Sequence, residues 1–246
     1  HPEKATPGMT NTVTQISILN ALLSRQFDGL IACRDLADHG DLGIGTFDRM
    51  DGELIMLDGR VYHGRPGGAV HPADPETTIP FATVCDFRSE QSWPLEGPLD
   101  YSALSRAIDA RAPNRNIVCA IRIDGRFASV RTHALQRQHR PYPPTADVVK
   151  GCVRTELEDV PGTIVGFRGV PYLRGLNDTG YHLHFVSQDR SRGGHVLDFS
   201  LTSGTCAIAR CPRHVTILPD AGDSLDGIDM TADLVGAFEH ALAARG

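Results

Sequence analysis

Residues 180–199 read GYHLHFVSQDRSRGGHVLDF and bring three histidines close together in the chain. His182 and His184 alternate with apolar residues, and on a β-strand residues two apart point to the same face, roughly 7 Å from each other. The polar, Gly-rich segment that follows has the composition of a turn, and His195 begins the next apolar run. The pattern predicts a β-hairpin on which the three imidazoles lie side by side.

Three imidazoles on one hairpin are typical of a metal site. Neutral ring nitrogens that converge on one point suit Zn²⁺ or another divalent transition ion, and three ligands leave coordination positions open for a substrate. The alternative is that the histidines merely alternate on a half-exposed strand. An HxH pair alone favours that alternative, but a third histidine directly after Gly193-Gly194 favours the metal. We therefore predict that His182, His184 and His195 bind a divalent metal at a catalytic site.

The composition of the 246-residue chain is that of an ordinary soluble globular protein. Its formal charge is −6 and its acidic and basic residues are interspersed, which excludes the basic surface expected of a nucleic-acid-binding protein. Apolar runs stay well below the roughly 20 residues that span a bilayer, so we expect no membrane association. We expect a cytoplasmic protein, or a secreted one if a signal segment ahead of His1 has been removed.

Strand-like and helix-like patterns alternate along the chain, which predicts the α/β class and, within it, an α+β fold. Helices are expected within residues 15–29 and 100–113 and from about Thr231 onward. The segment 116–135 is typical of two strands joined by a tight turn at Asp124-Gly125.

The Pro-rich segment RPYPP, residues 140–144, is the best candidate for an internal boundary. We therefore expect two packed halves built on mixed β-sheets with a few flanking helices. The N-terminal half would comprise residues 9–140. The C-terminal half, residues 141–246, would carry the metal-binding hairpin.

The histidine segment also carries a resemblance to a known family. Together with GDLGIGTFDRMDGELIMLDG at 40–59, and with RPYPP followed by PGTIVGF at 161–167, it resembles the α-acetolactate decarboxylase family, in the same order and over almost the whole chain. The resemblance implies two packed α/β halves, a divalent metal, usually zinc, on the three histidines, and conversion of acetolactate to acetoin and carbon dioxide. It also implies a homodimer.

The resemblance assigns roles to further residues. Glu53, in the DGE segment, corresponds to a carboxylate that reaches the metal and the substrate, and Thr46, in GTFD, would line the pocket. His133 stands where the family typically has an arginine, and Arg131, two residues away, is expected on the same strand face to take over part of that role. The family also closes its site with a glutamate near the chain end, for which Glu239 is the candidate.

The expected chemistry fits this set of residues. Loss of CO₂ from a 2-hydroxy-3-oxo acid leaves an electron pair that delocalises into the ketone as an enediolate, which a metal stabilises as a Lewis acid. Glu53 or a metal-bound water would then deliver a proton to carbon. Two alternatives stay open. One is a cupin-like metal-dependent dioxygenase or isomerase. The other, which the histidine at position 133 favours, is a catalytically impaired metal-binding homologue.

Overall fold

The computed structural model describes residues 11–219 and 225–243. Over these residues the chain is an α+β protein made mostly of strands, with one seven-stranded, one five-stranded and one two-stranded sheet. The fold class predicted from the sequence is confirmed. Residues 9, 10, 220–224 and 244–246 of the two expected halves lie outside the described residues.

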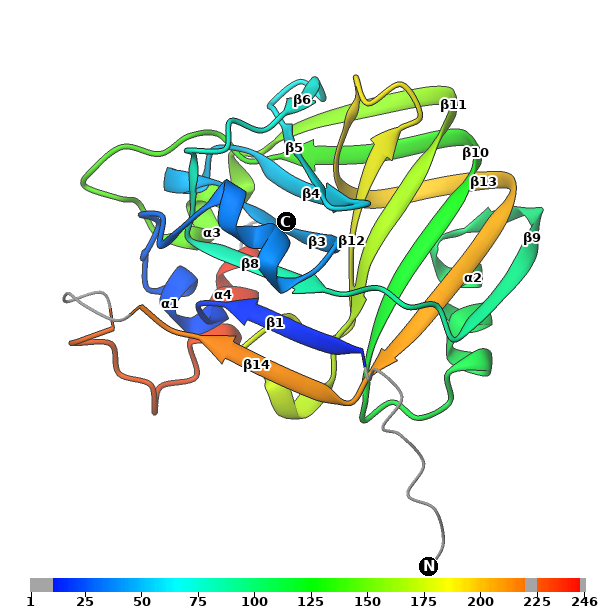
Figure 1. Cartoon of the computed structure of the whole chain (residues 1–246). Coiled ribbons are helices and arrows are strands. Elements are labelled where there is room, and N and C mark those ends of the chain that lie inside the picture. Colours follow the sequence, from blue (N-terminus) through cyan, green and yellow to red (C-terminus); the bar gives the residue numbers. More distant parts are fainter. Residues whose placement is uncertain (1–10, 220–224, 244–246) are drawn as a thin grey trace, which may run out of the picture.

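The seven-stranded sheet is assembled from both ends of the chain (Figure 1). β1 pairs in parallel with β14 and antiparallel with β8, and the remaining neighbours are antiparallel. In spatial order the strands are β14 (Arg213–Ile217), β1 (Thr12–Ile16), β8 (Phe81–Cys85), β3 (Leu42–Thr46), β4 (Glu53–Leu57), β5 (Arg60–Gly64) and β6 (Val70–Pro72).

The five-stranded sheet is antiparallel and contains the histidine hairpin. In spatial order its strands are β10 (Val118–Ala134), β11 (Val153–Arg168), β12 (Tyr181–Ser187), β13 (Gly193–Cys211) and β9 (Gln91–Asp100). β13 pairs with β12 and with β9, and along most of its length it also pairs with β10. The strands β10, β11, β12 and β13 therefore form a closed ring of paired strands.

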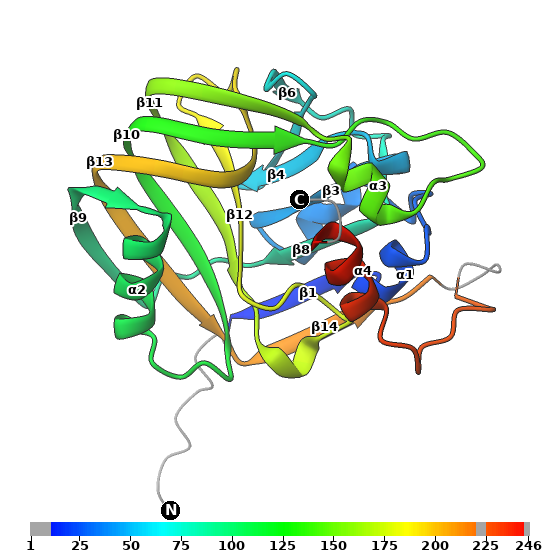
Figure 2. The ribbon, with the colours of Figure 1, turned by 180° about the vertical axis from the view of Figure 1, so that it is seen from behind.

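Short helices flank the sheets, and none of those within the described residues is long and apolar enough to cross a membrane. α2 packs on the five-stranded sheet, whereas α1, α3 and α4 gather at the other end of the molecule (Figure 2). The remaining elements are α1 (Leu19–Leu23), α2 (Tyr101–Arg111), α3 (Thr145–Lys150), α4 (Leu234–Ala243), the 3₁₀ turns Cys33–His39, Asp48–Met50 and Pro171–Leu173, and the strand pair β2 (Ile31–Ala32) and β7 (Thr78–Ile79).

Two apolar layers hold this arrangement together. One lies between the large sheets and joins residues such as Ile44 and Ile55 to Val165 and Val186. The other lies between the five-stranded sheet and α2, where Leu104 and Ile108 pack against β-strand residues such as Phe127. Because the first layer is formed by both sheets, residues on facing strands of the two sheets can contribute to one site.

The hairpin predicted at Asp124-Gly125 is wrong. Both residues lie within β10, where they pair with Thr163 and Gly162 of β11. A Cβ on Gly125 would stand 2.6 Å from the Ser203 carbonyl oxygen. The glycine therefore serves the close approach of β10 to β13, and a turn dipeptide in sequence is here part of a continuous strand.

Two other boundaries differ from expectation. The first helix is confined to α1, and residues 15 and 16 of the predicted region instead belong to β1, which comprises Thr12–Ile16. The cut between residues 140 and 141 does not separate the sheets, since β9 and β10 lie beside the C-terminal strands and β14 lies beside β1. The division into halves 9–140 and 141–246 stays a prediction.

A buried ion pair joins α2 to the five-stranded sheet. Arg168, at the end of β11, is 4% exposed, and its Nη1 lies 2.9 Å from Asp109 Oδ1 and donates to the Ala112 carbonyl. Burial alone would raise the pKa of Asp109, but the hydrogen bonds from Arg168 and Tyr181 outweigh it and leave the pKa below its usual value. The folded state therefore favours the ionised carboxylate.

We predict that Asp109→Asn lowers the free energy of unfolding by about 2 kcal/mol at pH 7, because it leaves the buried Arg168 without its counter-charge. A depressed pKa contributes stability that is present above the unfolded-state value near 3.8 and is lost as the pH falls through the folded-state value. In urea unfolding between pH 7 and pH 3, the difference from wild type should shrink on the acid side. The exposed pair Arg126–Asp159 supplies the control, and Asp159→Asn should change stability by less than about 0.5 kcal/mol. A difference independent of pH would contradict the prediction.

Candidate metal centre

Strand register brings the histidines together. His195 of β13 lies opposite His184 of β12 on one side and opposite His133 of β10 on the other. His182 lies two residues before His184 on the same strand. The predicted hairpin therefore forms, and it places the three predicted ligands in one cluster, with His133 as a fourth imidazole beside them.

The three predicted ligands form one group that could hold a metal ion. One ligand atom of each of His182, His184 and His195 lies within 4.8 Å of the other two. The Nε2 atoms of His182 and His184 are 3.2 Å apart. Two nitrogens bound tetrahedrally to one zinc at its usual bond length are about 3.3 Å apart. The His182–His184 spacing fits that value, and three imidazoles are a donor set that suits a divalent transition metal.

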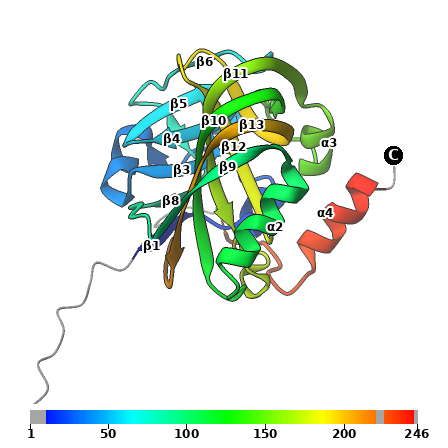
Figure 3. The same cartoon turned by 90° about the vertical axis from the view of Figure 1, so that its right-hand side faces the viewer.

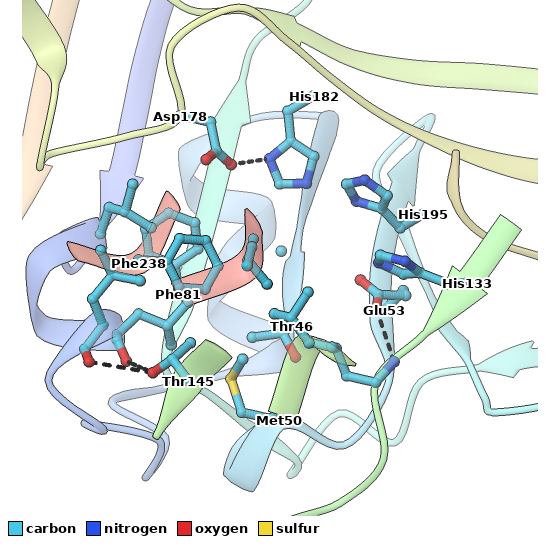
Figure 4. Close-up of a pocket in the computed structure, with 17 residues that line it drawn as sticks. Thr46, Met50, Glu53, Phe81, His133, Thr145, Asp178, His182, His195 and Phe238 are labelled. Carbon is cyan, nitrogen blue, oxygen red and sulfur yellow. Dashed lines mark hydrogen bonds and ion pairs between the residues drawn. The ribbon is translucent and has the colours of Figure 1, made fainter. Parts of the chain in front are cut away.

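Hydrogen bonds decide which ring nitrogens remain free. His184 Nδ1 lies 2.8 Å from the Leu54 carbonyl oxygen, which only accepts, so Nδ1 carries the proton. His182 Nδ1 lies 2.6 Å from Asp178 Oδ2 and donates to it (Figure 4). With both Nδ1 atoms donating, the neutral rings turn two Nε2 lone pairs toward each other. A metal cation between the two atoms removes that repulsion. In the metal-free protein a proton on His182 Nε2 does so as well, because the Asp178 carboxylate outweighs burial and raises the pKa of His182.

Glu53 reaches the same cluster from the other sheet. It is the first residue of β4, its Oε1 accepts a hydrogen bond from the Leu135 amide at 3.0 Å, and its Oε2 lies 3.6 Å from His184 Nε2. Burial raises the pKa of the Glu53 carboxyl to about 7, against the opposing effect of the Leu135 N–H. One carboxylate oxygen is therefore fixed by the backbone, and the other faces the imidazoles.

Thr46 and His133 also lie at the cavity, as expected. The Thr46 hydroxyl donates to the Gly52 carbonyl at 2.7 Å, which closes the turn that leads into Glu53. The His133 ring stacks on His195 with centroids 4.4 Å apart and an interplanar angle of 15°. Burial lowers the pKa of His133 to about 4, so this group is neutral where an arginine would be charged.

The structure does not bring Arg131 into the cavity. A register shift in the β10–β13 pairing follows Arg131, which lies opposite Asp198. The guanidinium forms a 2.7 Å ion pair with that carboxylate, and the Arg131 side chain is 57% exposed. Contrary to the expectation from strand alternation, Arg131 is held on the outer surface by its cross-strand partner.

Glu239 is likewise directed away from the histidines. Its carboxylate lies 3.2 Å from Arg174, and its side chain is 59% exposed. The helix that carries it nevertheless borders the cavity, through Phe238 and Leu242. Because Glu239 pairs with Arg174 and does not line the cavity, α4 covers the site with apolar groups and not with its glutamate.

Asp178 is the residue that sequence reasoning missed. It lies in the loop before β12 and lines the cavity as well as accepting from His182. Gly180, at φ +109°, turns the chain so that a residue four positions before the histidine folds back onto it. The sequence offers only the turn residues NDTG as a signal, and these do not indicate where the carboxylate points.

The cavity between these groups measures about 240 Å³. Its apolar lining comes from α1, α3, α4 and strand β8, with Met50 and Leu135. Its polar lining consists of Glu53, Asp178, two threonines and three histidines, His133, His182 and His195. Among the described residues, no lysine or arginine lines it. The arrangement is that of a small-molecule site beside a histidine cluster that could hold a metal ion.

Comparisons with known proteins agree with this geometry. A family model for alpha-acetolactate decarboxylase matches residues 13–230. The chain is 39% identical over 225 residues to the alpha-acetolactate decarboxylase of Methanosarcina mazei, covering 90% of this chain and 78% of that protein. It is 37% identical over 216 residues to that of Methylococcus capsulatus, covering 87% and 82%. The crystal structure of alpha-acetolactate decarboxylase from Bacillus subtilis strain 168 matches with a TM-score of 0.89 at 32% identity, covering 94% of this chain and 98% of that chain.

The family model spans most of the chain, and both sequence and fold match over nearly all of it. The chain therefore belongs to the alpha-acetolactate decarboxylase family of carboxy-lyases.

Proposed function

We propose that this chain converts 2-acetolactate to acetoin and CO₂ with a divalent metal, zinc by preference, bound by His182, His184 and His195. The observation that carries the proposal is the pair of Nε2 atoms that face each other at 3.2 Å with both Nδ1 atoms engaged. Family membership supports the substrate and favours this function over a cupin-like dioxygenase or isomerase. The homodimer implied by the resemblance stays a prediction.

A bound divalent ion supplies Lewis-acid stabilisation of the negative charge that develops on the substrate oxygens as CO₂ leaves. The chain contributes by keeping that ion's charge intact, because three neutral imidazoles add no negative charge of their own. Thr46 braces the turn in front of Glu53, and the apolar lining limits access of water. His133, stacked on His195, presents a neutral hydrogen-bonding ring to the cavity.

Glu53 is proposed as the proton donor to carbon. Its Oε1 is fixed by the Leu135 N–H, so its Oε2 keeps a constant position toward the cavity. Positioned general acids contribute about 10²–10⁴-fold to rates of this kind. The carboxyl has no arginine or lysine in contact among the described residues that would hold it permanently ionised.

The first experiment measures acetoin formation from racemic acetolactate by zinc-loaded and chelator-treated protein. We expect acetoin formation to depend on the metal. We expect Glu53→Gln to lower kcat at least about 100-fold. The metal content of this variant should be unchanged, because the glutamine side chain still accepts a hydrogen bond from the Leu135 amide. The impaired-homologue alternative predicts bound metal without acetoin in wild type and recovery of activity in His133→Arg. If neither the zinc-loaded wild type nor the zinc-loaded His133→Arg variant forms acetoin, the proposed decarboxylase activity is refuted.

A second experiment tests Asp178 as a positioning residue. Its carboxylate fixes the ring orientation of His182 and leaves Nε2 free. We expect Asp178→Ala to weaken zinc binding by about 10–100-fold in competition with a chromogenic chelator. Asp178→Asn, which keeps an acceptor oxygen, should recover part of that loss. Asp198→Ala serves as the control, because Asp198 lies on β13 but pairs outward with Arg131. Equal zinc affinity in wild type and Asp178→Ala would exclude the role.

A further inference from the structure

The cavity at the histidines has two chemically different sides. Figure 4 shows His133, His195 and Glu53 on one side and Phe81 and Phe238 on the other. The second side is completed by α1, α3 and α4, and we call it the apolar wall. Its members are Leu19, Leu23, Phe81, Val149, Phe238 and Leu242.

Much of the apolar wall is not buried by the protein itself. Phe238 and Leu242 of α4 are only partly buried, as are Leu19 and Leu23 of α1 and Val149 of α3. α4 has no fully buried residue at all, although it packs on α1 and α3 at the periphery of the molecule (Figure 3). Apolar area that faces a cavity instead of the core gains free energy when a ligand covers it.

On the polar side, the free Nε2 atoms of His182 and His184 are already assigned to the proposed metal. Each imidazole or carboxylate there has a partner, as in His182 with Asp178 or Glu53 with Leu135, or stacks on a neighbour as His133 does. The apolar area reaches beyond what a single methyl group can cover, because it is supplied by three separate helices and β8. A volume of about 240 Å³ lies below the roughly 300–1,000 Å³ of sites for drug-sized ligands, which restricts any extension to a short chain.

We propose that the apolar wall is a subsite for the 2-alkyl group of the substrate, and that this chain prefers 2-hydroxy-3-oxo acids whose 2-substituent has about three carbons to acetolactate, whose 2-substituent is a methyl. The proposal rests on the proposed decarboxylation. The reaction is the same: the bond from C2 to the carboxylate carbon breaks, its electron pair stays on the substrate, CO₂ leaves, and one proton is added to carbon. No oxidant or reductant is needed.

The test compares CO₂ release from 2-hydroxy-2-methyl-3-oxobutanoate, which is acetolactate, and from its 2-propyl homologue, with zinc-loaded protein. Each methylene that becomes buried is worth about fourfold, so two methylenes in a partly open cavity should raise kcat/KM about tenfold. A 2-hexyl homologue should bring no further gain, because the cavity is too small for it.

A binding measurement separates the subsite from the chemistry. The probes are 2-hydroxy-2-methylbutanoate and 2-ethyl-2-hydroxypentanoate, which lack the ketone and cannot be decarboxylated. Titration calorimetry with zinc-loaded protein should give an affinity about tenfold higher for the longer acid. The same pair measured on metal-free protein reports the contribution of the apolar wall alone.

Variants on α4 locate the effect. Leu242→Ser should lower the ratio of 2-propyl to 2-methyl kcat/KM about fivefold. The control is Val235→Ser, an equally half-buried residue of the same helix that does not line the cavity, which should leave that ratio unchanged. Val149→Phe, which fills the subsite from α3, should also lower the ratio and does not depend on how α4 tolerates serine.

The outcomes separate the two proposals. Acetolactate turnover with no preference for the 2-propyl homologue overturns the subsite and leaves the decarboxylase. No CO₂ from either substrate, together with tighter binding of the longer acid that is lost in Leu242→Ser, overturns the decarboxylase and supports the subsite. Equal binding of both acids without turnover overturns both.

Discussion

The site depends on the register of three strands. His195 lies across from His184 and from His133 at the same time, so one residue of β13 aligns β12 and β10. A shift of one residue in the register between β12 and β13 would turn one imidazole to the opposite face of the sheet, and the three histidines would no longer lie together. Gly193 and Gly194 secure that register. A Cβ on Gly193 would overlap the Phe185 carbonyl oxygen, and one on Gly194 would stand 2.6 Å from the His133 carbonyl oxygen.

The second sheet completes the site through two consecutive residues of β4. Glu53 contributes its carboxylate, and the carbonyl of Leu54 fixes the tautomer of His184. Both functions require the apolar layer between the sheets, because only that packing brings β4 against β12 and β13. The same contact that buries apolar area therefore orients His184, and a packing defect there would weaken the proposed metal site.

Sequence reasoning succeeded where the determining interactions are local. The histidine hairpin could be predicted because alternation, turn residues and Gly193-Gly194 are contiguous in the chain. The prediction for β10 was wrong because Asp124-Gly125 has the composition of a turn. These residues continue the strand because β13 lies close beside them, which the local sequence does not indicate. The prediction for Arg131 was wrong because Asp198, its partner, lies 67 residues away. Glu239 and Asp178 depend on the same kind of long-range information, through Arg174 and the fold of the loop before β12.

The apolar wall also bears on the rate of the reaction. A carboxylate transferred from water to an apolar surrounding loses favourable solvation, whereas CO₂ carries no charge and loses little. With its 2-alkyl group on the apolar wall and its ketone and hydroxyl near the imidazoles, a substrate would hold its carboxylate in a largely apolar cavity, which would destabilise it relative to its products. Because no lysine or arginine lines the described part of the cavity, no side-chain cation there offsets that destabilisation. An arginine at position 133 would stabilise the carboxylate before as well as during its loss, and the neutral His133 avoids this ground-state effect.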